Sequence, residues 1–270
     1  MSSLSAVAEN NDVGVEPFYE VQANEVDVLR LAYKGQMPVL LKGPTGCGKS
    51  RLIEKIAFEF KRPLITVSCN EDTSATELIG RYLVKGLETV WCDGPLTRAV
   101  REGGVLYLDE VVEAREDVLV LIHSLTDHRR MLFIDATGEA IKAPENFMLV
   151  MSYNPGYQRS FKELKASTKQ RFISIQLVYP DAATEVKILE KETGATKSLA
   201  TKLVSLAHKI RPLSELSLSE SVSTRLLVYA TKLIQSGMNP REAAQVAIVN
   251  PLTDDLETAQ ALKDLVALHL

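Results

Sequence analysis

The most informative segment of this 270-residue sequence reads Gly43-Pro44-Thr45-Gly46-Cys47-Gly48-Lys49-Ser50. It follows a short apolar run, residues 39–41, and precedes residues 52–60, whose apolar positions repeat with helical spacing. The pattern G-x-x-x-x-G-K-[ST] between a strand and a helix is typical of a loop that binds nucleotide phosphates. Glycines let backbone N–H groups turn toward the phosphates, and the positive end of the following helix adds to the attraction. We expect every residue of this loop to contribute to a nucleotide site, with Lys49 on the β- and γ-phosphates and Ser50 as a ligand of Mg²⁺.

An acidic pair, Asp109-Glu110, follows a second apolar run at residues 105–108. Such a run predicts a buried strand, and open α/β sheets bind their ligands beyond the carboxyl ends of the strands. We therefore expect Asp109 to hold Mg²⁺, directly or through water, and Glu110 to polarise the attacking water as a general base. Acidic residues after a strand can also cap a helix, but the position downstream of the phosphate loop favours the catalytic interpretation.

Short apolar runs that predict strands alternate with amphipathic segments in the first two thirds of the chain. The runs are residues 39–41, 64–68, 105–108, 147–152 and 173–177. This alternation predicts an α/β fold with a parallel sheet that helices cover on both faces. Two further pairs of strand-like runs, around residues 80–91 and 131–143, have turn residues between them and predict hairpins.

The pattern of apolar residues changes after Pro180, where the strand-like runs end. Helical patterns then occupy residues 181–192, 197–209, 219–235, 240–249 and 255–270. We therefore expect three parts: a flexible N-terminal segment at residues 1–16, an α/β nucleotide-binding core at residues 17–179, and an all-helical lid at residues 180–270.

The phosphate loop, the acidic pair and the helical C-terminal part together resemble the AAA+ ATPases. Asn154, after a predicted strand, resembles the sensor-1 residue, which orients the attacking water. Arg171 resembles the arginine finger that reaches the γ-phosphate of a neighbouring subunit, and Arg225 resembles the sensor-2 arginine of the lid. Each could instead form a turn or a surface charge. The resemblance implies an ATPase that binds ATP and Mg²⁺ and whose catalytic residues are Glu110, Asn154, Arg171 and Arg225.

Looser motifs narrow the resemblance to the MoxR clade and its CbbQ/NorQ branch. These are the two hairpins, Lys169-Gln170-Arg171-Phe172 and Ser223-Thr224-Arg225-Leu226-Leu227. The CbbQ type, to which the sequence looks most similar, implies a homo-hexameric ring. With a von Willebrand-domain adaptor, CbbO, that ring acts as a rubisco activase that releases inhibitory sugar phosphates. NorQ relatives serve the maturation of nitric oxide reductase instead. The sequence departs from the clade at Val111-Val112-Glu113, where other members have Ile-Asn-Arg, so no role of that Asn or Arg is carried over.

Composition and charge argue against several other classes of protein. The net charge is −4, from 31 basic and 35 acidic residues, which gives no sign of a nucleic-acid-binding surface. Apolar runs are too short to span a bilayer and residues 1–16 lack the features of a secretory signal, so we expect a cytoplasmic protein without a membrane partner. The three cysteines form no CxxC pair, and the four histidines have no metal-like spacing.

The leading hypothesis from the sequence is an ATP-driven motor that remodels a protein client. A P-loop phosphotransferase would share the phosphate loop, but it would need neither an arginine finger nor a helical lid. A GTP-dependent switch would need an Asn-Lys-x-Asp motif, which the sequence lacks. A DNA-remodelling AAA+ protein is disfavoured by the charge balance.

Overall fold

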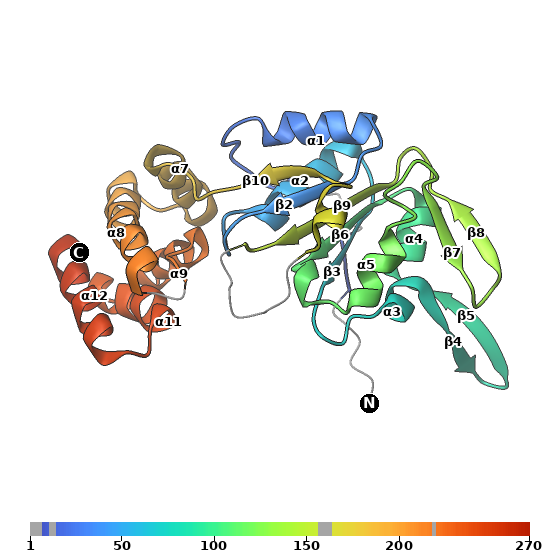
Figure 1. Cartoon of the computed structure of the whole chain (residues 1–270). Helices are drawn as coiled ribbons and strands as arrows, with labels where there is room; N and C mark the ends of the chain where they lie inside the picture. The colour runs from blue at the N-terminus through green and yellow to red at the C-terminus, as the bar shows by residue number, and fades with distance from the viewer. Residues whose placement is uncertain (1–6, 11–14, 156–163, 218–219) are drawn as a thin grey trace. The chain divides into compact units, whose positions relative to one another are not determined.

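The computed structural model describes residues 7–10, 15–155, 164–217 and 220–270. The chain forms two compact units, both drawn in Figure 1. The first comprises Met1–Gly43 and Gly48–Leu177, and the second comprises Pro44–Cys47 and Val178–Leu270. The division along the chain falls just before the boundary predicted after Tyr179. The assignment of Pro44–Cys47, the tip of the phosphate loop, to the helical unit is a feature that the sequence did not predict.

A six-stranded sheet in the order β1-β3-β6-β9-β2-β10 forms the centre of the first unit. Its five parallel strands are β2 (Val39–Lys42), β3 (Leu64–Ser68), β6 (Val105–Asp109), β9 (Met148–Tyr153) and β10 (Ile173–Gln176). Their apolar residues are largely buried, which explains why the sequence shows them as continuous apolar runs. The predicted α/β fold with a parallel sheet is confirmed.

The sheet has one antiparallel edge strand, β1 (Val7–Asn10), which pairs with β3. The sequence predicts no regular structure in residues 1–16, and for residues 7–10 that prediction is wrong. An edge strand needs a hydrogen-bonded neighbour on only one side, so a four-residue segment without apolar alternation can join a sheet that is already formed.

Helices and two small hairpins complete the first unit (Figure 1). The helices are α1 (Glu25–Lys34), α2 (Lys49–Phe60), α3 (Ala75–Ile79), α4 (Pro95–Glu102), the 3₁₀ turn η1 (Val111–Glu113), α5 (Glu116–Ile122) and α6 (Ala166–Lys169). One hairpin joins β4 (Gly80–Lys85) to β5 (Glu88–Asp93), and the other joins β7 (Met131–Ile134) to β8 (Glu139–Lys142). Both predicted hairpins are confirmed.

The second unit is helical among its described residues. It contains α7 (Ala182–Thr193), α8 (Lys197–Ser217), α9 (Thr224–Gln235), α10 (Pro240–Ala244), the π-helical turn η2 (Gln245–Val249), α11 (Asn250–Leu252) and α12 (Leu256–His269). Side-chain caps begin several of these helices; Asp181 accepts from the Thr184 N–H and Ser223 from the Leu226 N–H. Leu189, Leu203 and Ile210 lie in the unit's own apolar core. Among the described residues, no helix is both long and apolar enough to cross a bilayer.

Candidate nucleotide-binding and hydrolysis site

The phosphate loop lies between the end of β2 and the start of α2. Gly46 has φ 71° and Gly48 has φ 99°, in the left-handed region that other residues enter at a cost. Gly46 is also tightly enclosed, because a Cβ built on it would lie 2.7 Å from the Cβ of Ser223. The backbone turn that would aim N–H groups at a phosphate therefore depends on glycine at both positions.

The Lys49 side chain is folded across the loop. It is only 7% exposed, and its Nζ donates to the carbonyl oxygen of Gly43 at 3.0 Å. The same Nζ lies 3.7 Å from Oε1 of Glu110. The predicted phosphate-binding cation and the predicted general base are therefore neighbours within the first unit.

Asp109 is held at the carboxyl end of β6 by two hydroxyls. Tyr107 Oη donates to Asp109 Oδ1 at 2.8 Å, and the Ser152 hydroxyl donates to the same oxygen. Burial, followed by the charge of Asp109, raises the pKa of Tyr107 well above its ordinary value, so its hydroxyl stays protonated and remains a donor. Both donors share Oδ1, which fixes the orientation of the carboxylate, and no residue in the described part of the chain donates to Oδ2, which leaves that oxygen for a cation.

These residues fit a magnesium ion. The Tyr107 hydroxyl is also hydrogen-bonded to the side chain of Ser50, so the two predicted metal ligands, Ser50 and Asp109, are linked through one phenol. Hydroxyl and carboxylate oxygens are the donors that Mg²⁺ takes alongside substrate phosphates and water. Mg²⁺ held there would neutralise phosphate charge. Among the described residues, no cluster of three or more His, Cys, Asp or Glu side chains offers a site made wholly by the protein.

Glu110 has a left-handed backbone conformation and a carboxyl group whose pKa is raised. Its φ is 52° and its ψ is 49°, a left-handed conformation that costs a non-glycine residue free energy. Burial raises the pKa of its carboxyl group; Lys49 opposes this shift, Asp109 adds to it, and the backbone N–H of Asn154 opposes it. A carboxyl group with a raised pKa, beside a lysine that can bind phosphate, suits proton abstraction from water.

The remaining three predicted catalytic residues are in different places. Asn154 follows β9 and contacts Glu110 through its backbone. Arg171 is exposed and precedes β10, and no described contact joins it to Lys49 or Glu110. Burial lowers the pKa of His123, and the nearby charge of Arg171 lowers it further. Arg225 belongs to the second unit, in the first turn of α9, where its Cβ lies 3.5 Å from a Cβ built on Gly46.

Comparison with known proteins identifies this arrangement. Residues 38–172 match the AAA domain of the dynein-related subfamily, and residues 185–269 match the CbbQ/NirQ/NorQ C-terminal domain. The chain is 56% identical to Protein NorQ of Paracoccus denitrificans over 251 residues, 93% of each chain. The chain belongs to the CbbQ/NirQ/NorQ family of AAA+ ATPases.

Other members of the CbbQ/NirQ/NorQ family match over similar lengths. The denitrification regulatory protein NirQ of Pseudomonas aeruginosa is 52% identical, over 94% of this chain and 98% of that protein. Protein CbbQ of Hydrogenophilus thermoluteolus is 49% identical, over 92% of this chain and 93% of that protein. Among solved structures, a RuvB mutant of Thermotoga maritima has the same fold at a TM-score of 0.55 and 16% identity, over 90% of this chain and 73% of that chain. The protein is thus an AAA+ ATPase.

Sequence reasoning missed two residues of this family member's site. In the sequence, Tyr107 and Ser152 stand out only as members of apolar strands, yet together they orient Asp109. The signal that could have revealed Tyr107 is chemical, because a buried phenol requires a hydrogen-bond partner. Ser152 also accepts from the Glu110 backbone N–H at 3.2 Å, so one hydroxyl contacts both members of the acidic pair.

Proposed function

We propose that this protein is a motor that uses ATP hydrolysis to remodel a protein client. The observation that carries the chemistry is the position of Glu110, half-buried and 3.7 Å from the Lys49 ammonium. In the proposed reaction, Lys49 and the loop N–H groups bind the phosphates, and Ser50 and Asp109 hold Mg²⁺. Glu110 accepts a proton from the attacking water, and Asn154 orients that water.

The proposed active unit is a ring, as a homo-hexamer, in which each site lies between two subunits. The exposed position of Arg171, without a described contact to its own Lys49 or Glu110, supports a role toward a neighbouring subunit. A guanidinium that reaches a γ-phosphate from another subunit is worth about 10³–10⁵ in rate in GTPases. Arg225, beside Gly46, is proposed to sense the phosphate from the lid.

The two hairpins are proposed to contact the client. In the first hairpin, Leu87 is fully exposed and Val84 is 77% exposed. Exposed apolar surface of this kind can mark a site of contact with another protein. The hairpins are also linked, because Tyr82 Oη donates to the Ala136 carbonyl oxygen at 3.3 Å. Arg101 of α4 joins them as well, through ion pairs with Asp93 and Glu139 at 2.8 and 2.6 Å. The two hairpins would therefore move together.

The client is proposed from the relatives. Identities of 56% to NorQ and 52% to NirQ support a denitrification enzyme, nitric oxide reductase, as the client. The CbbQ match at 49% over nearly the whole chain supports rubisco as a second candidate, with release of inhibitory sugar phosphates as the outcome. In both cases we propose a von Willebrand-domain adaptor and a cytoplasmic location.

A Glu110→Gln variant tests this function. It should bind ATP without hydrolysing it, assemble into a ring on a sizing column, and retain its client from the native cytosol. Lys49→Ala, which removes the phosphate cation, is the matched control and should retain no client. Capture of a nitric oxide reductase subunit or of rubisco would identify the client. A variant that stays monomeric at saturating ATP would contradict the ring, and transfer of phosphate to an acceptor would contradict the motor.

The role of the hairpins has its own test. Leu87→Ser should slow remodelling of the captured client, whereas Leu31→Ser, which changes a 64% exposed leucine of α1 in the same unit, should not. Equal effects of the two variants would contradict a client-binding hairpin.

A further inference from the structure

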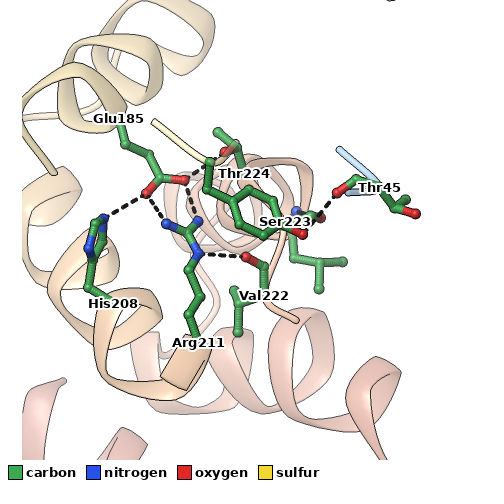
Figure 2. A network of polar contacts seen from close by, with 9 residues as sticks. Thr45, Glu185, His208, Arg211, Val222, Ser223 and Thr224 are labelled. Carbon is green, nitrogen blue, oxygen red and sulfur yellow. Dashed lines mark hydrogen bonds and ion pairs between the residues drawn. The ribbon is translucent and has the colours of Figure 1, made fainter. Parts of the chain in front are cut away.

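The helical unit contains a charged network with a fully buried carboxylate at its centre. Glu185 of α7 has no exposed surface, and the Arg211 guanidinium contacts both of its oxygens, at 2.6 and 2.9 Å. The Thr224 hydroxyl donates to Oε1 at 2.6 Å, and Nε2 of His208 lies 3.3 Å from Oε2. Figure 2 shows these side chains converging on Glu185. Neither the acidic pair nor the two arginines of the proposed site belong to this network.

A buried ion pair is a poor source of stability but a strong geometric constraint. Desolvation of the two charges offsets much of their attraction, whereas a fully hydrogen-bonded arrangement leaves few alternative positions for its members. Arg211 is constrained further, since its Nε donates to the Val222 carbonyl oxygen at 3.0 Å. The network therefore fixes the positions of whatever else it contacts.

One of its contacts is Tyr179, in the segment before α7. The Arg211 guanidinium lies 4.3 Å from the centre of the Tyr179 ring, within cation–π distance. The Tyr179 hydroxyl donates to the carbonyl oxygen of Thr45 at 3.1 Å, and Thr45 is a residue of the phosphate loop. Burial raises the pKa of Tyr179 to about 12, so the hydroxyl is protonated and acts as a donor. Figure 2 labels Thr45, and a dashed line marks the hydrogen bond to its oxygen.

The contact with Thr45 bears on phosphate binding because of peptide geometry. A trans peptide is planar, so a hydrogen bond that holds the Thr45 carbonyl directs the N–H of Gly46 to the opposite side. In the proposed nucleotide site, that N–H is one of the loop's donors for phosphate oxygens. Gly46 has φ 71° and no Cβ, so its own dihedral angles do little to hold this peptide in one orientation.

The second contact of the network is the start of α9. Thr224 donates to Glu185, Ser223 caps α9, and Arg225 follows in its first turn. A Cβ on Gly46 would lie 2.9 Å from the Ser223 hydroxyl oxygen, so this turn is packed against the loop. Glu185 thus connects to the loop by two routes, through Tyr179 and through Thr224.

We propose that Glu185, Arg211 and Tyr179 are positioning residues for ATP binding, which orient the Thr45–Gly46 peptide and the turn that carries Arg225. None of the three is proposed to touch the reacting atoms. The proposal rests on ATP binding at the phosphate loop, and it is independent of the client, the adaptor and the ring.

The test measures ATP affinity of the full-length chain by titration calorimetry with Mg²⁺ present. Tyr179→Phe removes only the hydroxyl, and Tyr229→Phe, at a 51% exposed tyrosine of α9, is the matched control. We expect Tyr179→Phe to weaken ATP binding by about five-fold, the effect of one neutral hydrogen bond, and the control to stay within two-fold of wild type. Equal affinities of the two variants would overturn the proposal.

A double-mutant cycle separates positioning from a general structural role. Arg211→Lys keeps a positive charge for Glu185 but loses the two-pronged contact and the stacking on Tyr179. The effect of Arg211→Lys on ATP affinity should be smaller in the Tyr179→Phe background, because the hydroxyl that Arg211 positions is already absent there. Independent effects of the two changes would overturn the relay. Failure of the wild-type chain to bind ATP would overturn the nucleotide site itself, and the proposal with it, so the two failures are distinguishable.

Discussion

The left-handed backbone of Glu110 should reverse the usual stability order of alanine and glycine. At φ 52° and ψ 49°, a residue with a Cβ pays about 1–2 kcal/mol that glycine does not. Glycine in turn loses about 0.5–1 kcal/mol through the greater freedom of its unfolded chain. The balance predicts that Glu110→Gly is more stable than Glu110→Ala by roughly 0.5–1 kcal/mol. Both variants lack the carboxylate near Lys49, so that loss cancels in the comparison.

A single fluorophore makes this difference measurable in the correct unit. Trp91 is the only tryptophan of the sequence, and it packs against the core of the α/β unit from β5. Its fluorescence therefore follows unfolding of the unit that contains Glu110. For a unit of this size, the predicted difference corresponds to a thermal midpoint higher by about 2 °C for Glu110→Gly. Both variants should also have lost ATP hydrolysis, since neither has the proposed general base.

The matched control is the same pair of substitutions at Glu54, inside α2 of the same unit. There the backbone is an ordinary right-handed helix, so the glycine variant should be less stable than the alanine variant by about 1 kcal/mol. A higher midpoint for Glu110→Ala than for Glu110→Gly would refute the argument that Glu110 is held in a strained conformation.

Three further predictions concern the same site. Because the fold raises the pKa of Glu110, Glu110→Gln should be more stable than wild type at neutral pH, and the gap should close as the pH falls toward the ordinary value of 4.5; midpoints across a pH series check this. A mixture of inactive Arg171→Ala and Lys49→Ala proteins should recover ATPase activity, because each supplies the half of a shared site that the other lacks; no recovery would contradict the arginine finger. Gly46→Ala should weaken ATP binding by more than about ten-fold through the left-handed strain and the clash with the nearby serine, whereas Gly194→Ala, at φ 69° with open space around it, should not; calorimetry compares them.

The sequence was sufficient for the parallel sheet because the signal there is local and redundant. Each parallel strand is an apolar run, and burial on both faces of the sheet requires that composition. The edge strand β1 gave no such signal, since one hydrogen-bonded neighbour is enough to hold it. The predicted helix at residues 240–249 divides into α10 and the π-helical turn η2. Such a change of helix type depends on packing rather than on apolar spacing.

The candidate site was predictable only where its residues follow one another along the chain. The phosphate loop and the acidic pair are contiguous motifs, and their positions after β2 and β6 follow from the strands. The hydroxyls of Tyr107 and Ser152 meet across 45 positions of sequence, and Glu185 meets Thr224 across 39. Neither pair leaves a period or a spacing, so three-dimensional packing was needed to find them.

Some residues of the proposed site are held within the α/β unit, whereas others belong to the helical unit or are proposed to come from another subunit. Asp109 and Glu110 sit at the end of a buried strand, fixed by hydroxyls and by a strained backbone, so their geometry is set before ATP arrives. The loop peptide at Thr45 depends instead on Tyr179, a residue of the helical unit, and Arg171 is proposed to act on another subunit. Loss of the Glu110 carboxylate alone should therefore leave ATP binding intact, whereas loss of the Tyr179 hydroxyl should change ATP affinity without altering Glu110.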